Sequence, residues 1–305
     1  MKKNPKALVI ISTFNGEKYI EEQLNSIINQ TYKNIEIMVR DDCSTDKTYN
    51  ILKKYEKEYD FIQVERGKKN LGYPKCFYEL TNNAKKADYY FFADQDDIWL
   101  ENKIERAIKI IETEEDINRP FAYYSGYKIC DSNMNVVGSS KKRINNIKFK
   151  DTLYEVCGLE FTMAINNKAL ELLNSNKPIK SKARGTWMSM LYSAFGIVYY
   201  DNYETALYRR HEKSVTSNKM SGLGLWKWRI KKFFSNKNFE NYKTILNEFY
   251  KICNAELDDK DLKIIKLFTN YSFINRFRKT FYLKRLRSNI IDELALRLMF
   301  LIGKL

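Results

Sequence analysis

The 305 residues include 44% hydrophobic and 14% aromatic side chains, which is enough for a substantial core and excludes a globally disordered chain. No run reaches the roughly 20 apolar residues that span a bilayer, and the run Ala7 to Ile11 behind the basic start is too short for a signal peptide, so we expect a cytoplasmic protein. The formal net charge is +15, and residues 226–305 hold 18 Lys and Arg against 8 Asp and Glu, which indicates an anionic partner, a membrane surface or a solvated basic face.

The first hundred residues alternate short apolar runs with helical periodicity. The run Ala7-Leu8-Val9-Ile10-Ile11-Ser12 is continuous, as is typical of a strand buried on both faces of a parallel sheet. Asn15-Gly16 ends it, and apolar residues then recur at helical spacing from Tyr19 to Ile28. Further strands are predicted at 35–39, 61–64 and 89–93, with helices from an N-cap at Ser44 to Tyr59 and over 74–87. This alternation predicts an α/β fold with a doubly wound, largely parallel sheet.

Polar and acidic side chains follow three of the predicted strands. They are Thr13-Phe14-Asn15 after the first strand, Asp41-Asp42 after the second and Asp94-Gln95-Asp96-Asp97 after the fourth. Ligands of open α/β sheets bind beyond the carboxyl ends of the strands. The sequence therefore predicts a binding site at this edge of the sheet.

The acidic run 94–97 suits a divalent cation. Its three carboxylates repel one another unless a cation lies among them, and Mg²⁺ or Mn²⁺ is commonly held by one or two carboxylates together with substrate phosphates. A solvated acidic turn or a helix N-cap is the alternative. For Asp41-Asp42 the alternatives are a carboxylate that binds a nucleotide base or ribose and a helix N-terminus marked by Ser44 and Asp46.

Four motifs in order resemble family 2 glycosyltransferases of the GT-A fold, in particular the bacterial rhamnosyltransferase-like branch that builds surface polysaccharides. The motifs are Ile10-Ile11-Ser12-Thr13-Phe14-Asn15-Gly16, Val39-Arg40-Asp41-Asp42-Cys43-Ser44-Thr45-Asp46, Asn70-Leu71-Gly72 and Ala93-Asp94-Gln95-Asp96-Asp97-Ile98-Trp99. The resemblance covers about residues 5 to 217. It implies a catalytic domain at 1–220, with a nucleotide-sugar half at 1–97 and an acceptor half at 98–220, followed by a basic helical region at 221–305.

The resemblance also implies a reaction. The enzyme would move a hexose or deoxyhexose, such as rhamnose or galactose, from a UDP- or dTDP-sugar to a sugar hydroxyl of a surface glycan or lipid-linked glycan, with inversion at the anomeric carbon. Mn²⁺ or Mg²⁺ would be the cofactor.

Individual roles follow from the matching positions. The residues that would bind the donor nucleotide are Thr13, Asn15, Glu17, Asp41, Asp42, Lys75, Asp94, Arg209 and Arg210. Asp94 and Asp96 would form the DXD pair, with Asp96 the principal metal ligand. His211, the only histidine, lies in the segment Tyr208-Arg209-Arg210-His211, which resembles the family segment that folds over the donor diphosphate. It would contact the metal or the diphosphate, and a purely structural histidine is the alternative.

The catalytic base departs from the family pattern. Many relatives carry an Asp just before a Trp in the helix after the acceptor loop, whereas Gly185-Thr186 precedes Trp187 in this chain. Because an inverting transfer needs a base to deprotonate the acceptor hydroxyl, we hypothesise that Glu160 takes this role. A catalytically inactive nucleotide-sugar binder is the alternative.

The C-terminal region carries apolar residues at helical spacing from Leu283 to Leu301, with basic residues near one end. Such a helix can lie at an anionic membrane surface, at the inner face of the plasma membrane, or pack on the catalytic domain or on a second subunit in a homodimer. The sequence pI of about 9.3 also raises the alternative of a nucleic-acid-binding protein. We expect no nucleic-acid partner, because the basic excess lies away from the acidic edge and no nucleic-acid motif is recognised.

Overall fold

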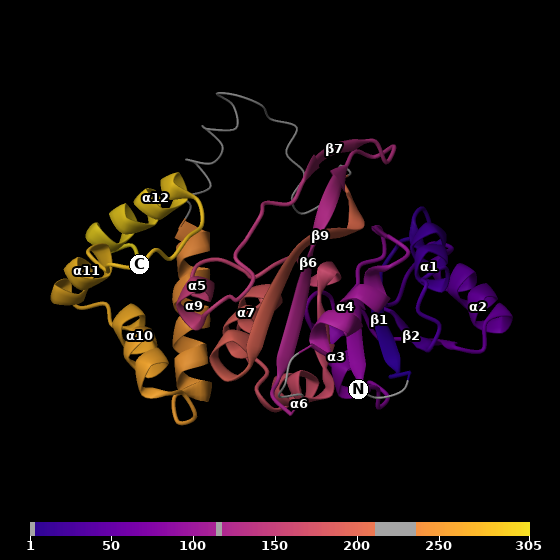
Figure 1. The fold of residues 1–305 in the computed structure, drawn as a ribbon, viewed down its shortest axis with the longest axis horizontal. Helices are drawn as coiled ribbons and strands as arrows, with labels where there is room; N and C mark the ends of the chain where they lie inside the picture. Colours follow the sequence, from indigo (N-terminus) through magenta and orange to yellow (C-terminus); the bar gives the residue numbers. More distant parts are fainter. Residues whose placement is uncertain (1–3, 114–117, 211–235) are drawn as a thin grey trace. The chain divides into compact units, whose positions relative to one another are not determined.

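The computed structural model describes residues 4–113, 118–210 and 236–305, and these form two compact units (Figure 1). The first unit comprises the described residues of 4–147 together with 158–177 and 195–210. The second unit comprises 148–157, 178–194 and the described C-terminal residues. The domain boundary predicted near residue 220 lies outside the described residues. In the part of the chain that the structure describes, no helix is long and apolar enough to cross a membrane.

The first unit begins with alternating strands and helices. They are β1 (Ala7–Thr13), α1 (Ile20–Ile28), β2 (Ile35–Asp41), α2 (Thr48–Glu58), β3 (Ile62–Arg66), α3 (Lys75–Asn82) and β4 (Tyr89–Ala93). β1 pairs in parallel with both β2 and β4, and β3 pairs in parallel with β2. Every residue of β4 is buried, as expected for a strand in the interior of the sheet. The predicted α/β fold is confirmed, and the parallel sheet expected from the first hundred residues is formed by β1 to β4, which belong to a larger mixed sheet.

Two helix boundaries differ from the prediction. α2 begins at Thr48 and not at Ser44, because the Ser44 hydroxyl is already engaged as the acceptor of a hydrogen bond from the Asn15 backbone amide at 3.0 Å. The N-cap predicted at Ser44 is therefore wrong. α3 ends at Asn82, earlier than the predicted end at Ala87.

The rest of the first unit extends the same sheet. It contains β5 (Ile98–Trp99), α4 (Lys103–Ile111), β6 (Phe121–Cys130), β7 (Val136–Ser139), the 3-10 helix η1 (Glu160–Thr162), β8 (Ala164–Asn166), α6 (Asn167–Ser175) and β9 (Ile197–Arg209). The strand order is β3-β2-β1-β4-β8-β6-β9-β5, with β7 paired to β6. β8 is antiparallel to both β4 and β6, whereas the long strands β6 and β9 run parallel side by side (Figure 1).

The second unit is helical. It holds α5 (Phe149–Thr152), most of α7 (Arg184–Phe195), α9 (Asn236–Cys253), α10 (Asp259–Thr269), α11 (Phe273–Thr280) and α12 (Ile290–Leu301). Aromatic rings build its core: Tyr154 contacts the rings of Phe268 and Phe300 at centroid distances of 5.7 and 5.4 Å. The single helix predicted from Leu283 to Leu301 is wrong in its first part, because α12 begins only at Ile290.

Candidate active site

The carboxyl ends of β1, β2 and β4 meet at one edge of the sheet in the first unit. Thr13 is in register with Asp41 on β2, and Ile11 is in register with Ala93 on β4. The three polar segments predicted from the sequence therefore follow neighbouring strands. Thr13 itself is buried, and its hydroxyl has no hydrogen-bond partner among the described residues.

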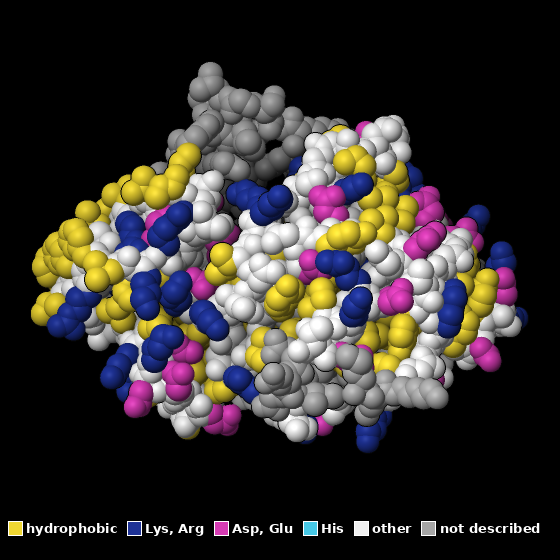
Figure 2. All heavy atoms as spheres, in the orientation of Figure 1, with side chains coloured by type: hydrophobic (Ala, Val, Ile, Leu, Met, Phe, Trp, Pro, Cys, Tyr) yellow, Lys and Arg dark blue, Asp and Glu magenta, His cyan; other side chains and the backbone are white. Residues whose placement is uncertain are grey.

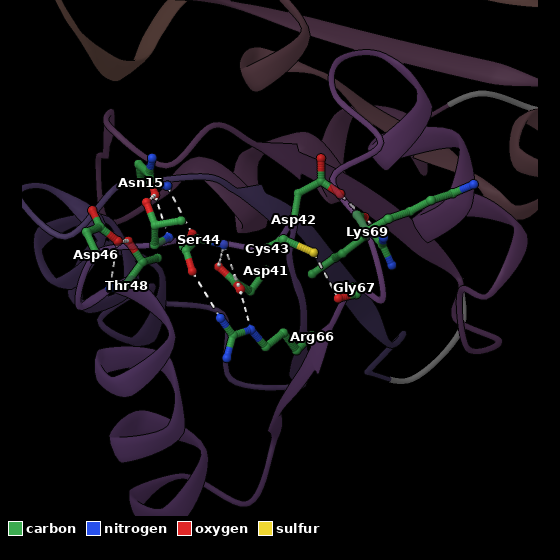
Figure 3. Close-up of polar contacts among 12 residues, drawn as sticks. Asn15, Asp41, Asp42, Cys43, Ser44, Asp46, Thr48, Arg66, Gly67 and Lys69 are labelled. Carbon is green, nitrogen blue, oxygen red and sulfur yellow. Dashed lines mark hydrogen bonds and ion pairs between the residues drawn. The ribbon is translucent and has the colours of Figure 1, made fainter.

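The loop after β1 is bonded to the loop after β2 (Figure 3). The Asn15 Oδ1 accepts a hydrogen bond from the Thr45 amide at 2.8 Å, and the Gly16 amide donates to the Thr48 hydroxyl at 2.8 Å. Glu17 adds a third link, since its Oε2 accepts from the Lys47 amide at 2.9 Å. The predicted donor-site residues Asn15 and Glu17 thus hold two loops of the site together.

Asp41 and Asp42 are both buried and face different partners. The Asp41 carboxylate accepts a hydrogen bond from the Ser44 amide at 3.1 Å and lies 3.5 Å from Arg66 Nε at the end of β3. The Asp42 carboxylate accepts from the backbone amides of Leu71 and Gly72 at 2.9 and 2.8 Å. The second and third sequence motifs are therefore adjacent because Asp42 binds the Asn70-Leu71-Gly72 segment.

Arg40 completes the buried charge beneath this edge. Arg40 is 4% exposed, and its guanidinium lies 3.4 Å from Asp42 Oδ1. The same group donates to the Lys69 carbonyl at 3.4 Å, so it reaches the loop that Asp42 also holds. One buried cation and one buried carboxylate thus anchor the backbone of residues 69–72.

The acidic run after β4 is joined to the loop after β1 by Gln95. Its carboxamide accepts from the Phe14 amide at 2.9 Å and donates to the Phe14 carbonyl at 3.2 Å. A Cβ on Gly16 would lie only 2.4 Å from Gln95 Oε1. A larger residue at position 16 would therefore force the Gln95 carboxamide to shift away from the Phe14 backbone groups that it binds.

The four residues of the acidic run differ in burial: three lie at the rim of the site and one lies in the interior. Asp94, Gln95 and Asp96 are half-buried, whereas Asp97 is 1% exposed and accepts a hydrogen bond from the Arg209 amide at 3.2 Å. Burial raises the pKa of Asp97 well above its ordinary value, and the negative charges of Asp94 and Asp96 raise it further. Asp97 is thus a structural carboxyl group beneath Asp94 and Asp96.

Lys103 lies in the same interior and was not predicted from the sequence. Its ammonium group donates to the Thr205 hydroxyl at 3.3 Å and lies 4.9 Å from the centre of the Trp99 ring. Burial lowers the pKa of Lys103 to about 7, while the charge of Asp97 acts in the opposite direction. The buried side of the acidic run therefore carries one acidic and one basic group.

The end of β9 brings Arg209 to the acidic run from a distant part of the sequence. β5, which follows the run directly, pairs antiparallel with β9. The Arg209 Nε donates to the Asp96 carbonyl at 3.1 Å, and the guanidinium forms an ion pair with Glu22 and lies over the Tyr19 ring. Arg210 is half-buried and donates its amide to the Cys130 carbonyl at 2.9 Å. His211 lies outside the described residues.

Glu160 begins η1, beside β4, in the same unit. Its Oε1 accepts a hydrogen bond from the Tyr73 hydroxyl at 2.7 Å. Lys75 is exposed at the first position of α3 and so follows Tyr73 closely in the chain. The Tyr73 hydroxyl therefore links the predicted base to the segment that precedes α3.

The sequence profile described as "Glycosyl transferase family 2" matches residues 8–167, which span all three loops of this edge and Glu160. The chain belongs to glycosyl transferase family 2. The family predicted from the four motifs is confirmed, and the protein is a glycosyltransferase.

Two curated relatives and one solved structure are similar to this family 2 glycosyltransferase. The dTDP-rhamnosyl transferase RfbG of Shigella flexneri is 30% identical over 264 residues, 82% of this chain and 85% of the relative. The UDP-Glc:alpha-D-GlcNAc-diphosphoundecaprenol beta-1,3-glucosyltransferase WfaP of Escherichia coli is 31% identical over 219 residues, 70% of this chain and 81% of the relative.

The solved structure is S. aureus TarS 1-349 in complex with UDP-GlcNAc. It is 19% identical, with a TM-score of 0.62, over 98% of this chain and 81% of that chain. At this identity the likeness concerns the fold, and it supports the GT-A architecture predicted from the sequence.

The fit of a divalent cation to this glycosyltransferase depends on Asp94 and Asp96. Within the described ranges, no group of three or more His, Cys, Asp and Glu side chains could hold a metal ion. The third predicted ligand, His211, is not among those residues. Asp94 and Asp96 stand at the rim while Asp97 is turned inward. Two carboxylates with oxygens from a substrate phosphate are a donor set that Mg²⁺ and Mn²⁺ commonly accept, so the residues fit the ion.

Sequence reasoning missed Arg66, Tyr73, Lys103 and the role of Gln95. Arg66 had a usable signal, because it follows the strand predicted at 61–64 and so lies at the same edge as Asp41; the observed strand β3 ends at Arg66. Its side chain is 50% exposed and covers the Tyr49 ring at 4.7 Å. Tyr73 carried no pattern of its own, and only its bond to Glu160 identifies it.

Proposed function

We propose that this glycosyltransferase transfers a hexose or deoxyhexose from a UDP- or dTDP-sugar to a sugar hydroxyl of a surface or lipid-linked glycan, with inversion. The observation that carries the proposal is the convergence of the loops after β1, β2 and β4 with the end of β9 on Asp94 and Asp96. RfbG is a dTDP-rhamnosyl transferase, and WfaP is a UDP-Glc-dependent glucosyltransferase named for a diphosphoundecaprenol-linked acceptor. We extend this donor class and this kind of acceptor to the present chain.

The donor nucleotide is proposed to lie against the interlocked loops of Asn15, Glu17 and Thr45. Asp41 is buried and is paired with the more exposed Arg66. Arg66 is therefore proposed to contact the base or ribose at the end of β3. Thr13 offers a buried hydroxyl at the end of β1, and Lys75 offers an exposed ammonium at the start of α3.

The donor diphosphate is proposed to lie at the rim of the acidic run. Asp94 and Asp96 would hold Mn²⁺ or Mg²⁺, which supplies Lewis-acid stabilisation of the leaving diphosphate. Arg209 and Arg210 add positive charge at the same place, and His211 follows them in the chain. Arg209 is fixed by three separate contacts, so its charge is preorganised.

Glu160 is proposed as the base. Its carboxylate removes the proton of the acceptor hydroxyl while that oxygen attacks the anomeric carbon and the bond from that carbon to the diphosphate breaks. The Tyr73 hydroxyl, 2.7 Å from Glu160 Oε1, orients the carboxylate. Gly185 and Thr186, in the first turn of α7, supply no carboxylate at the family position.

The donor assignment is tested by thermal unfolding with UDP-, dTDP- and GDP-sugars in the presence of Mn²⁺. We expect one nucleotide class to stabilise the wild type, and the shift to be lost in Asp96→Ala. Asp60→Ala is the matched control, because Asp60 is exposed and precedes β3. Lack of stabilisation by every sugar nucleotide would contradict the proposal.

The base assignment is tested by the transfer rate of Glu160→Gln. We expect the rate to fall about 10²- to 10⁴-fold, with donor stabilisation retained. A rate close to that of the wild type would remove Glu160 from this role. Donor stabilisation without turnover in the wild type would instead favour the inactive nucleotide-sugar binder, which the missing carboxylate at Gly185-Thr186 suggests.

A further inference from the structure

The second unit exposes many apolar side chains on α11, on α12 and in the residues that adjoin these helices. We call this set the apolar face. Its members are Phe273, Ile274, Phe277, Phe281, Leu283, Ile290, Ile291, Leu294, Leu298, Leu301 and Ile302, which are 42–99% exposed. In Figure 2 hydrophobic side chains gather over α11 and α12, with Lys and Arg side chains beside them. Apolar patches of this extent usually mark an interaction surface.

The polarity of α11 is inverted relative to a helix that packs on a protein core. It buries Asn275 and Lys279, which are 9% and 0% exposed. It exposes Phe273 and Phe277, which are one turn apart and contact each other at a ring distance of 5.1 Å. The Lys279 ammonium lies inside the unit, 4.3 Å from the centre of the Tyr271 ring. A helix with its aromatic side chains on the exposed face is typical of one that contacts an apolar partner or a lipid phase.

The segment between α11 and α12 is held in place by two charged side chains of α12, the half-buried Arg297 and the buried Glu293. The Arg297 Nη1 on α12 donates to the carbonyls of Lys279, Thr280 and Tyr282 at 3.0, 3.0 and 2.6 Å. The Glu293 carboxylate accepts from the amides of Leu286 and Arg287 at 2.9 and 2.8 Å. The exposure of Leu283, at 99%, is therefore a property of an ordered backbone.

The exposed charged side chains beside the apolar face are mainly cations, whereas Asp292 in the first turn of α12 is half-buried and Glu293 is buried. From Phe273 to Ile291 the chain contains six Lys and Arg residues and no Asp or Glu, and Arg278, Lys284 and Arg285 are exposed. A two-fold contact with a second copy would bring these cations against one another, which is unfavourable. An anionic lipid surface receives both the apolar side chains and the cations.

We propose that the apolar face is a membrane-binding surface that inserts into the interface of an anionic lipid bilayer. Phe273, Phe277, Leu283 and Leu294 enter the boundary between headgroups and acyl chains, and Arg278, Lys284 and Arg285 contact the anionic headgroups. This inference does not depend on the donor, the acceptor or the base proposed above.

The test is co-sedimentation of the full chain with phosphatidylcholine vesicles that contain or lack phosphatidylglycerol. We expect binding at low salt only to the anionic vesicles. Leu283→Ser with Leu294→Ser should weaken the partitioning at least about tenfold. Arg278→Ser with Arg285→Ser should weaken it about tenfold. The matched control is Val137→Ser with Ile144→Ser, which removes two exposed apolar side chains of the first unit and should leave binding unchanged.

Absence of the wild type from the anionic vesicles at low salt would overturn the proposal, as would equal binding of all variants. Light scattering of the wild type and the leucine variant provides the second measurement. A dimer that the leucine variant separates, together with no vesicle binding, would assign the apolar face to a second copy instead. Thermal stabilisation by the sugar nucleotide is measured on the same samples, so a failure of membrane binding is distinguishable from a failure of donor binding.

Discussion

Buried charged groups serve different purposes in the two units. In the first unit they gather beneath one edge of the sheet, where Asp42 pairs with Arg40 and Asp97 lies with Lys103 under the acidic rim. In the second unit they are dispersed, and two of them hold stretches of backbone: Glu248 accepts the amides of residues 179–181, and Glu293 accepts those of Leu286 and Arg287. The first unit thus concentrates charge to build a site. The second uses it to fix segments while apolar side chains face outward.

The largest expected effect is that of Asp42→Ala in the first unit. The change leaves two backbone amides without their acceptor and removes the buried counter-charge of Arg40. We expect the free energy of unfolding in urea to fall by about 3–5 kcal/mol, together with a loss of stabilisation by the sugar nucleotide. Asp60→Ala serves as the control. A loss below about 1 kcal/mol would mean that this cluster is not what holds the edge together.

Glu248→Ala probes the contrasting use of charge in the second unit. Its carboxylate is 9% exposed and accepts from Ile179, Lys180 and Ser181 at 2.6, 2.7 and 2.8 Å. We expect the free energy of unfolding to fall by about 2–3 kcal/mol, with the stabilisation by the sugar nucleotide unchanged. Glu256, exposed after α9, provides Glu256→Ala as the matched variant. If Glu248→Ala abolished donor stabilisation, the distinction between the two units would fail.

Asp261→Asn is expected to change the free energy of unfolding least, and the size of this change depends on pH. Burial and the neighbouring Asp258 raise the pKa of Asp261 to about 6 in the folded state. The folded state therefore binds more protons than the unfolded state between about pH 4 and 6. The contribution of Asp261 to stability is greatest below pH 4 and falls as pH rises through this range.

The asparagine side chain does not titrate, so Asp261→Asn should gain stability relative to the wild type as pH rises. We expect this gain to increase by about 1 kcal/mol between pH 5 and 7.5, measured by urea unfolding at each pH. A difference that stayed constant over this range would show that Asp261 does not keep its raised pKa.

Local patterns were sufficient to predict the first half of the sheet. The strand at 89–93 was predicted at its observed bounds, because five apolar residues between polar neighbours leave little choice of limits. The pairing of β6 with β9 carried no local signal, and with it the approach of Arg209 to Asp96 across the chain. Only the family resemblance pointed to Arg209.

The direction of individual side chains was the second feature that the sequence could not predict. Four consecutive residues at 94–97 indicate an acidic site, but they do not tell which carboxyl group turns inward. The backbone amide of Arg209 decides this for Asp97. The leucine spacing from Leu283 to Leu301 misled in the same way, because Glu293 and Arg297 hold the segment before α12 in a non-helical path that the spacing does not encode.

Because position 16 approaches Gln95 closely, the residue at one of these positions limits which residues the other can carry. Any side chain at position 16 would enter the space of the Gln95 carboxamide, and a shorter residue at position 95 would release both backbone groups of Phe14. The two positions should therefore change together among homologous enzymes. A library that redesigns the loop after β1 to accept another donor has to randomise position 95 in the same clones.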